Sequence, residues 1–136
     1  MSGICHNNLK FNVMKKIKII YNNIIPFEGF SAMSVGPWIF ARKKYEEIGL
    51  PDTTINHETI HWNQQCDFII PVLGSIIFYL WYFIEWVFKL PSALFGYDPY
   101  MSISFEQEAY NNEKDLEYLN KRKKFAWLKY LFKFSK

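Results

Sequence analysis

The 136-residue chain has few of the residues on which several protein classes depend. It contains two cysteines, too few for the disulfide framework of a small secreted domain. Six glycines and six prolines exclude a collagen-like or linker-like composition. Charge is also sparse, since charged residues make up 21% of the chain and the formal net charge is +3. Because half of the residues are hydrophobic, the composition excludes an intrinsically disordered chain and predicts one folded domain.

The N-terminus lacks the continuous apolar stretch of a secretory signal peptide. Residues 1–13 are polar, and Met14 opens a segment that reads like a natural start. We therefore expect residues 1–13 to be a flexible extension and residues 14–136 to form a single domain. His6 falls in the extension, which makes it a poor candidate for a metal ligand. The expected location is the cytoplasm or a membrane.

Arginine is scarce, with two residues against 14 lysines. Seven of the 16 basic residues lie in residues 121–136, which contain no acidic residue. Guanidinium groups are the preferred ligands of phosphates and bases, so this composition argues against nucleic acid as a partner. The simplest interpretation of this basic segment is a solvated amphipathic helix. Its interleaved aromatic residues also suit a membrane surface.

Turn residues separate two predicted strands from a series of predicted helices. Residues 15–21 and 36–42 are rich in β-branched and aromatic residues, which favour strands. The stretch between them forms either a third short strand or a loop. Residues 53–67 contain no glycine or proline and predict a helix, for which residues 52–54 offer N-caps. A further helix is expected from Ser104, after a loop.

One long hydrophobic run covers residues 68–90. No charge occurs in residues 68–84, and accepting Glu85 extends the run to 21 residues. About 20 apolar residues are needed to span a bilayer. Pro71 and Gly74 are expected to place the helix start near residue 72, and Glu85 would be costly in hydrocarbon. The first interpretation is a buried core helix, and the second is membrane insertion or peripheral association.

The strongest chemical signal is an HExxH pattern that contains two of the three histidines, His57 and His61. Residues four apart lie on one face of a helix, so the two imidazoles can bind one Zn²⁺. Glu58 can then hydrogen-bond a metal-bound water and act as the general base of a hydrolysis. The alternative is a pair of structural histidines on a buried helix, with Glu58 as an exposed charge.

A catalytic zinc needs a third protein ligand and an open position for water. Cys66 and Asp67 come next along the chain, but on a continuing helix both face away from the histidines. The third ligand is therefore expected from a later helix. The acidic candidates are Glu85, Glu106, Glu108 and Glu113.

Residues 104–110 resemble the glutamate helix of gluzincin metallopeptidases, in which the first Glu of an ExxA(D) motif binds zinc. The resemblance implies that Glu106 is the third ligand and that Ala109 lets this helix approach the histidines. Tyr110 stands where the family has Asp, which removes the carboxylate expected to orient a histidine ring. Glu113 lies on the same helix face and can take over that task.

The chain resembles even more closely small HExxH proteins of bacteria and their phages. The shared patterns are HExxHxxQQ over residues 57–65 and ExEA over residues 106–109. The resemblance covers most of the chain after Met14 and implies a zincin-like α+β fold. A small N-terminal β-sheet would precede a helical part that carries the HExxH helix and the glutamate helix.

These residues predict a zinc metallopeptidase that hydrolyses a peptide or protein substrate, with His57, His61 and Glu106 as zinc ligands. Tyr110 is either a donor to the tetrahedral intermediate or a core tyrosine with a satisfied hydroxyl. Gln64, on the histidine face of its helix, is expected either beside the ligands or in a helix-packing hydrogen bond. An extended peptide could add to the strand at residues 36–42 if that strand is an edge. The competing hypothesis is a non-catalytic protein, membrane-associated or not, that uses zinc to stabilise its fold.

Overall fold

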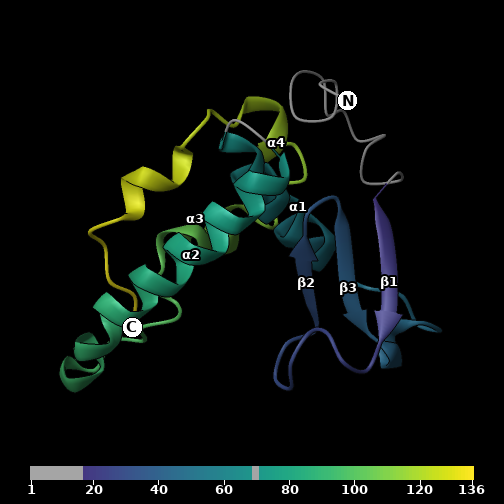
Figure 1. Ribbon diagram of the computed structural model, residues 1–136, viewed down its shortest axis with the longest axis horizontal. Helices are drawn as coiled ribbons and strands as arrows, with labels where there is room; N and C mark the ends of the chain where they lie inside the picture. Colours follow the sequence, from purple (N-terminus) through teal and green to yellow (C-terminus); the bar gives the residue numbers. More distant parts are fainter. Residues whose placement is uncertain (1–16, 69–70) are drawn as a thin grey trace.

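A three-stranded sheet comes first in the computed structural model, which describes residues 17–68 and 71–136 (Figure 1). The sheet consists of β1 (Lys18–Asn22), β2 (Ala32–Val35) and β3 (Trp38–Arg42), in the order β1-β3-β2. β1 runs parallel to β3, and β2 runs antiparallel to it. The helices follow the sheet, so the predicted α+β fold with a small N-terminal sheet is confirmed.

Both predicted strands are present, and the stretch between them supplies β2 as a third strand. β2 and β3 form a hairpin around Gly36, whose positive φ of 58° favours glycine. β3 therefore lies in the middle of the sheet, with a partner on each side. The prediction that the strand at 36–42 offers a free edge is wrong, because β1 and β2 are the edge strands.

The predicted HExxH helix is α1 (Asp52–Asp67), which follows the short 3₁₀ helix η2 (Lys43–Tyr45). It lies between the sheet and the other helices (Figure 1). Pro51 occupies the N-cap position and no side chain caps the helix, so the predicted caps are wrong. Asp52 lies instead in the first turn, where its carboxylate interacts favourably with the helix dipole.

Most of the buried side chains of α1 are polar. Buried polar groups cost free energy unless they find hydrogen-bond partners. Gln65 donates to the carbonyl of Ser34 (3.3 Å) and accepts from the N–H of Gly36 (3.1 Å), which ties α1 to the sheet. Asn56 donates to the carbonyl of Glu113 (2.8 Å), which ties α1 to the helical part. Specific hydrogen bonds therefore position this helix.

The hydrophobic run forms α2 (Pro71–Lys89), which continues as the 3₁₀ helix η3 (Leu90–Phe95). The predicted start near residue 72 is confirmed, but Gly74 does not interrupt the helix. A Cβ at this position would lie 2.3 Å from the carbonyl oxygen of Gln65. Glycine is therefore required here because α2 passes close to the backbone of α1.

The interpretation of the hydrophobic run as a buried core helix is wrong for most of α2. Residues Leu73–Phe95 are long and apolar enough to cross a membrane, and 22% of the most apolar stretch is buried. Phe78 does lie in the core, where its ring packs 4.4 Å from the ring of Phe105. The rest of the helix exposes apolar side chains.

The predicted glutamate helix is α3 (Ser104–Asn112). The amphipathic helix predicted for residues 121–136 is wrong, because that segment contains the last residue of α4 (Tyr118–Lys121) and the short η4 (Ala126–Tyr130). Two of its aromatic side chains, Trp127 and Tyr130, are buried, and the ring of Trp127 lies 4.6 Å from that of Phe105. These contacts hold the segment against the helices in place of a solvated helix.

Three apolar clusters form the core. One joins the sheet to the start of α1 around Ile39, and a second joins α2, α3 and η4 around Phe78 and Phe105. The third joins α1 to α3 around Ile60. The predicted extension at residues 1–13, with His6, lies outside the described residues.

A buried ion-pair network fastens the C-terminal segment to α1 and α3. Arg122 donates to both carboxylate oxygens of Asp67 (3.0 and 2.7 Å) and to Glu108 (2.6 Å). The hydroxyl of Tyr118 also donates to Glu108 (2.9 Å). The two carboxylates outweigh the effect of burial and hold the pKa of Arg122 above its usual value. Asp67, which the sequence analysis excluded as a metal ligand, is a member of this network.

Candidate metal centre

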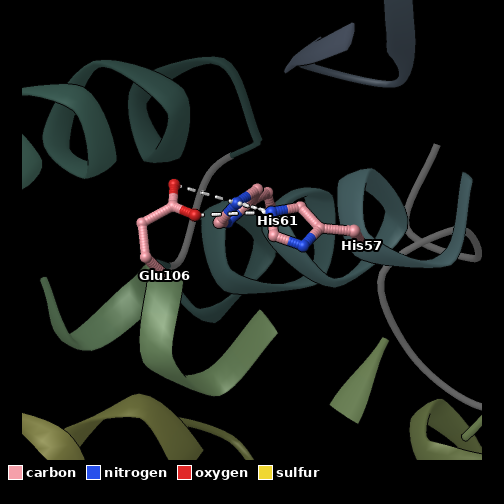
Figure 2. Close-up of side chains that lie close together, drawn as sticks. All are labelled: His57, His61 and Glu106. Carbon is pink, nitrogen blue, oxygen red and sulfur yellow. Dashed lines mark hydrogen bonds and ion pairs between the residues drawn. The ribbon is translucent and has the colours of Figure 1, made fainter. Parts of the chain in front are cut away.

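Three side chains from two helices converge on one place (Figure 2). His57 and His61 lie one turn apart on α1, with their Nε2 atoms 3.0 Å from each other. Glu106 on α3 places Oε2 3.4 Å from Nε2 of His57 and Oε1 3.3 Å from Nε2 of His61. All three residues are buried, and one ligand atom from each lies within 4.8 Å of the others.

The hydrogen bonds of the outer ring nitrogens determine which nitrogens face the centre. Nδ1 of His57 lies 2.9 Å from a carboxylate oxygen of Glu113, which can only accept, so Nδ1 carries the proton. Nδ1 of His61 lies 2.8 Å from Oε1 of Gln64. The Gln64 amide is fixed in this orientation because its Nε2 donates to the carbonyl of Phe105 (3.0 Å). Both histidines are therefore held with the lone pair of Nε2 directed at the centre.

Neutral imidazoles held in this way would present two Nε2 lone pairs beside the Glu106 carboxylate, which makes three electron-pair donors at one place. Oε2 of Glu106 is buried and has no hydrogen-bond partner among the described residues. Unpaired buried polar atoms are rare and need a structural reason. A cation between the two imidazoles and the carboxylate would satisfy all three, and two nitrogens with one oxygen form a ligand set suited to zinc.

The pKa shifts of the centre also favour a positive charge there. Burial alone would lower the pKa of His61, but the nearby carboxylate of Glu106 outweighs it and raises that pKa to about 9. Burial would raise the pKa of Glu106, but His61 and His57 hold it well below its usual range. The protein groups by themselves thus attract a proton, and a divalent cation can take its place.

No family model, curated protein or solved structure matches this chain. The resemblance to gluzincins and to small HExxH proteins therefore stays a prediction. The interpretation of the centre depends on its own geometry.

Glu58 is buried beside the three converging residues without being one of them. Its carboxylate accepts a hydrogen bond from the backbone N–H of Ser34 in β2. Burial raises the pKa of Glu58, while His61 and His57 oppose that rise. A raised pKa makes a carboxylate a better proton acceptor at neutral pH, as a general base requires. The alternative that Glu58 is an exposed charge is wrong.

Tyr110 lies next to the centre, at the border between protein and solvent. Its ring meets that of His57 edge-on, with the ring centroids 4.5 Å apart, and its side chain is half-exposed. Burial and the carboxylate of Glu106 raise the pKa of Tyr110, so its hydroxyl stays protonated. The hydroxyl shares a hydrogen bond with Tyr100. A protonated hydroxyl at this position can donate to a substrate oxygen.

The other acidic candidates lie outside the group of converging ligands. Glu85 accepts from the N–H of Ser104 (2.8 Å) and pairs with Lys89 (2.7 Å), so it caps the start of α3 instead. Glu108 belongs to the Arg122 network. Glu113 does not join the group but holds the ring of His57, the task predicted for it.

Sequence reasoning missed one contact of the centre. Tyr82 on α2 donates its hydroxyl to Oε1 of Glu106 (2.8 Å), although it lies in the hydrophobic run. The sequence contains a signal for this contact, because helical spacing puts Tyr82 on the same face of α2 as Phe78, Glu85 and Lys89. Gln64 was expected either beside the ligands or in helix packing, and it does both, since its amide contacts His61 and α3.

A cleft of about 840 Å³ opens at the centre. Glu58, both histidines, Glu106 and Tyr110 line it. Residues 29–34, which lead into and through most of the edge strand β2, also line it. Bulky aromatic side chains from the stretch before β2 and from α2 line it as well: Phe27, Phe30, Phe83 and Trp86, with Tyr79 and Tyr82.

Proposed function

We propose that the chain is a zinc-dependent metallopeptidase with a zincin-like arrangement of its HExxH and glutamate helices. The observation that carries the proposal is the convergence of His57, His61 and Glu106. Their inward-facing nitrogen lone pairs and carboxylate leave a place for one cation. Glu58 stands beside that place, and a cleft gives access to it.

A zinc ion held by these residues supplies Lewis acidity and lowers the pKa of a water molecule. Glu58 accepts the proton of the attacking water and later returns it to the leaving amine. Burial suits it to this task because a raised pKa brings it closer to neutral pH. Tyr110 donates a hydrogen bond to the oxygen that becomes negative in the transition state. Glu113 and Gln64 keep the two imidazoles oriented throughout.

The substrate would bind as an extended peptide along β2. The N–H of Ser34 donates to Glu58 and its carbonyl accepts from Gln65, so both backbone groups point away from β3 toward the centre. Strand residues two apart point their backbone groups the same way, so those of Ala32 face the same edge. The groups of Ser34 are already engaged by Glu58, Gln65 and Tyr79, so a peptide that adds as a strand would pair with the backbone groups of Ala32. The aromatic lining of the cleft favours bulky apolar side chains beside the scissile bond.

Peptide cleavage by the full-length chain, with mass spectrometry to identify the products, tests the proposal. A mixture of peptides rich in Phe, Leu and Tyr should be cut by the zinc-loaded protein at bonds next to these residues. Removal of zinc with a chelator should reduce cleavage to background, and added zinc should restore it. A protein that holds zinc at the centre but leaves every peptide intact would contradict the proposed activity.

A structural role for zinc is the second candidate. The observation that favours it is that the proposed ligands come from two helices, α1 and α3, which a metal would hold together. On this alternative zinc would raise the melting temperature without supporting hydrolysis. The cleavage experiment separates the two candidates, because they predict the same zinc content and opposite activity.

A further inference from the structure

The helix α2 has the reverse of the pattern seen on the surface helices of soluble proteins. Its charged side chains, Glu85 and Lys89, are buried against the protein. The side that faces away from the protein is apolar over most of the circumference of the helix. Phe83 and Trp86 border the cleft and Trp81 lies beside Trp127. The remaining exposed apolar residues of α2 and η3 are Leu73, Ile76, Leu80, Ile84, Val87, Phe88, Leu90, Leu94 and Phe95.

This outward face of α2 and η3 is strongly exposed to solvent. Leu80 is 59% exposed, Phe88 80% and Leu94 86%. Contiguous apolar surface on this scale marks a site that another apolar phase covers. The whole helix extends away from the sheet, so the face is not a local feature of one loop (Figure 1).

The two charges on the inner side of α2 are fully partnered within the protein. Glu85 accepts from the N–H (2.8 Å) and the hydroxyl (2.6 Å) of Ser104. Lys89 pairs with Glu85 and donates to the carbonyl of Ser102. Charges within a membrane-embedded segment are expected to face the protein interior and to pair in this way. The presence of Glu85 is therefore compatible with an apolar surrounding phase.

The basic C-terminal segment runs beside α2. The ring of Trp127 lies 5.8 Å from that of Trp81, and the carbonyl of Lys133 accepts from Lys89 (3.3 Å). The segment exposes apolar side chains of its own, including Phe132 at 88%. It also exposes five lysines without a nearby acidic residue in its sequence: Lys123, Lys124, Lys129, Lys133 and Lys136. This combination suits the boundary between hydrocarbon and anionic headgroups.

We propose that the outward face of α2 and η3 is embedded in the hydrocarbon of a lipid bilayer, with the lysines of residues 121–136 on anionic headgroups. The length fits, because the α-helical residues Leu73–Lys89 and the 3₁₀ residues Leu90–Phe95 together extend over more than the hydrocarbon core, which is about 30 Å thick. The charge complementarity of the basic segment selects the lipid bilayer over a second copy of the chain. The inference goes beyond the proposed function, since it needs neither zinc nor hydrolysis.

Flotation with lipid vesicles tests this inference on the full chain. The protein is mixed with vesicles of phosphatidylcholine, or of phosphatidylcholine with phosphatidylglycerol, and centrifuged in a density gradient. The double variant Leu80→Glu/Phe88→Glu places charges on the outward face at residues that do not line the cleft. Ile48→Glu is the matched control, because Ile48 is 78% exposed on the loop before α1. Circular dichroism in detergent verifies that each variant is folded.

The wild-type chain and Ile48→Glu should float with both vesicles, more strongly with the anionic ones, and should resist extraction by high salt and alkaline carbonate. The double variant should bind vesicles at least about tenfold more weakly, since each charge opposes transfer into hydrocarbon. Release by salt or carbonate would overturn the inference in favour of headgroup binding alone. A protein that stays in solution as a monomer, or as a dimer that covers this face, would also overturn it. None of these outcomes depends on peptidase activity.

Discussion

Glu58→Gln is expected to lower peptide hydrolysis by about 10²- to 10⁴-fold, the usual contribution of a general base. Glutamine keeps the shape of the side chain but cannot accept the proton of the attacking water. Zinc binding should be unchanged, because Glu58 is not one of the three converging ligands. The measurement is kcat/KM for a cleaved peptide, together with the zinc content of the same sample.

The folded state should tolerate this substitution. Glu58 is buried, and burial disfavours its charged form, so replacing it by a neutral group removes a buried charge. We expect a melting temperature equal to or above that of the wild-type chain. A Glu58→Gln protein with full activity would contradict the assigned role, and loss of zinc in this variant would place Glu58 among the ligands.

The second large effect is expected for Glu106→Gln, which should weaken zinc binding at least about 100-fold. The amide removes the negative charge that faces Nε2 of both histidines. Its carbonyl oxygen can still accept the hydroxyl of Tyr82, so the contact between α2 and α3 should survive. Equilibrium dialysis with a competing chelator of known affinity measures the change.

Glu117→Gln is the matched control for this measurement, because Glu117 is exposed and lies outside the centre. It should bind zinc as the wild-type chain does. Unchanged zinc affinity in Glu106→Gln would show that the third ligand is another group. His57→Ala provides an independent comparison and should lose zinc to a similar extent.

The position of the HExxH helix and of α3 could be predicted from the sequence because both carry local signals. Helical spacing alone puts His57 and His61 on one face. The choice of Glu106 among several acidic residues depended on a motif resemblance, and the observed convergence agrees with that choice. The role of Glu113 followed from its place on the same helix face as Glu106 and agrees with its contact to His57.

Other features could not be predicted because they depend on contacts between distant residues. The edge position of β2 follows from the pairing of β1 with β3, which no local pattern in residues 36–42 reveals. The Arg122 network joins residues that lie 55 and 14 positions apart in the chain. The sequence also could not show whether the apolar surface of α2 is buried in the protein or exposed, because a helix that is apolar all round is found both in protein cores and in membranes.

Zinc K-edge X-ray absorption of the zinc-loaded chain tests the central claim most directly, because it reports the atoms bound to the metal. The account predicts one zinc per chain with two imidazole nitrogens at about 2.0–2.1 Å, oxygen ligands and no sulfur. The oxygen ligands should be Glu106 and a water molecule. A sulfur ligand, fewer than two imidazoles, or a chain that binds no zinc would contradict it.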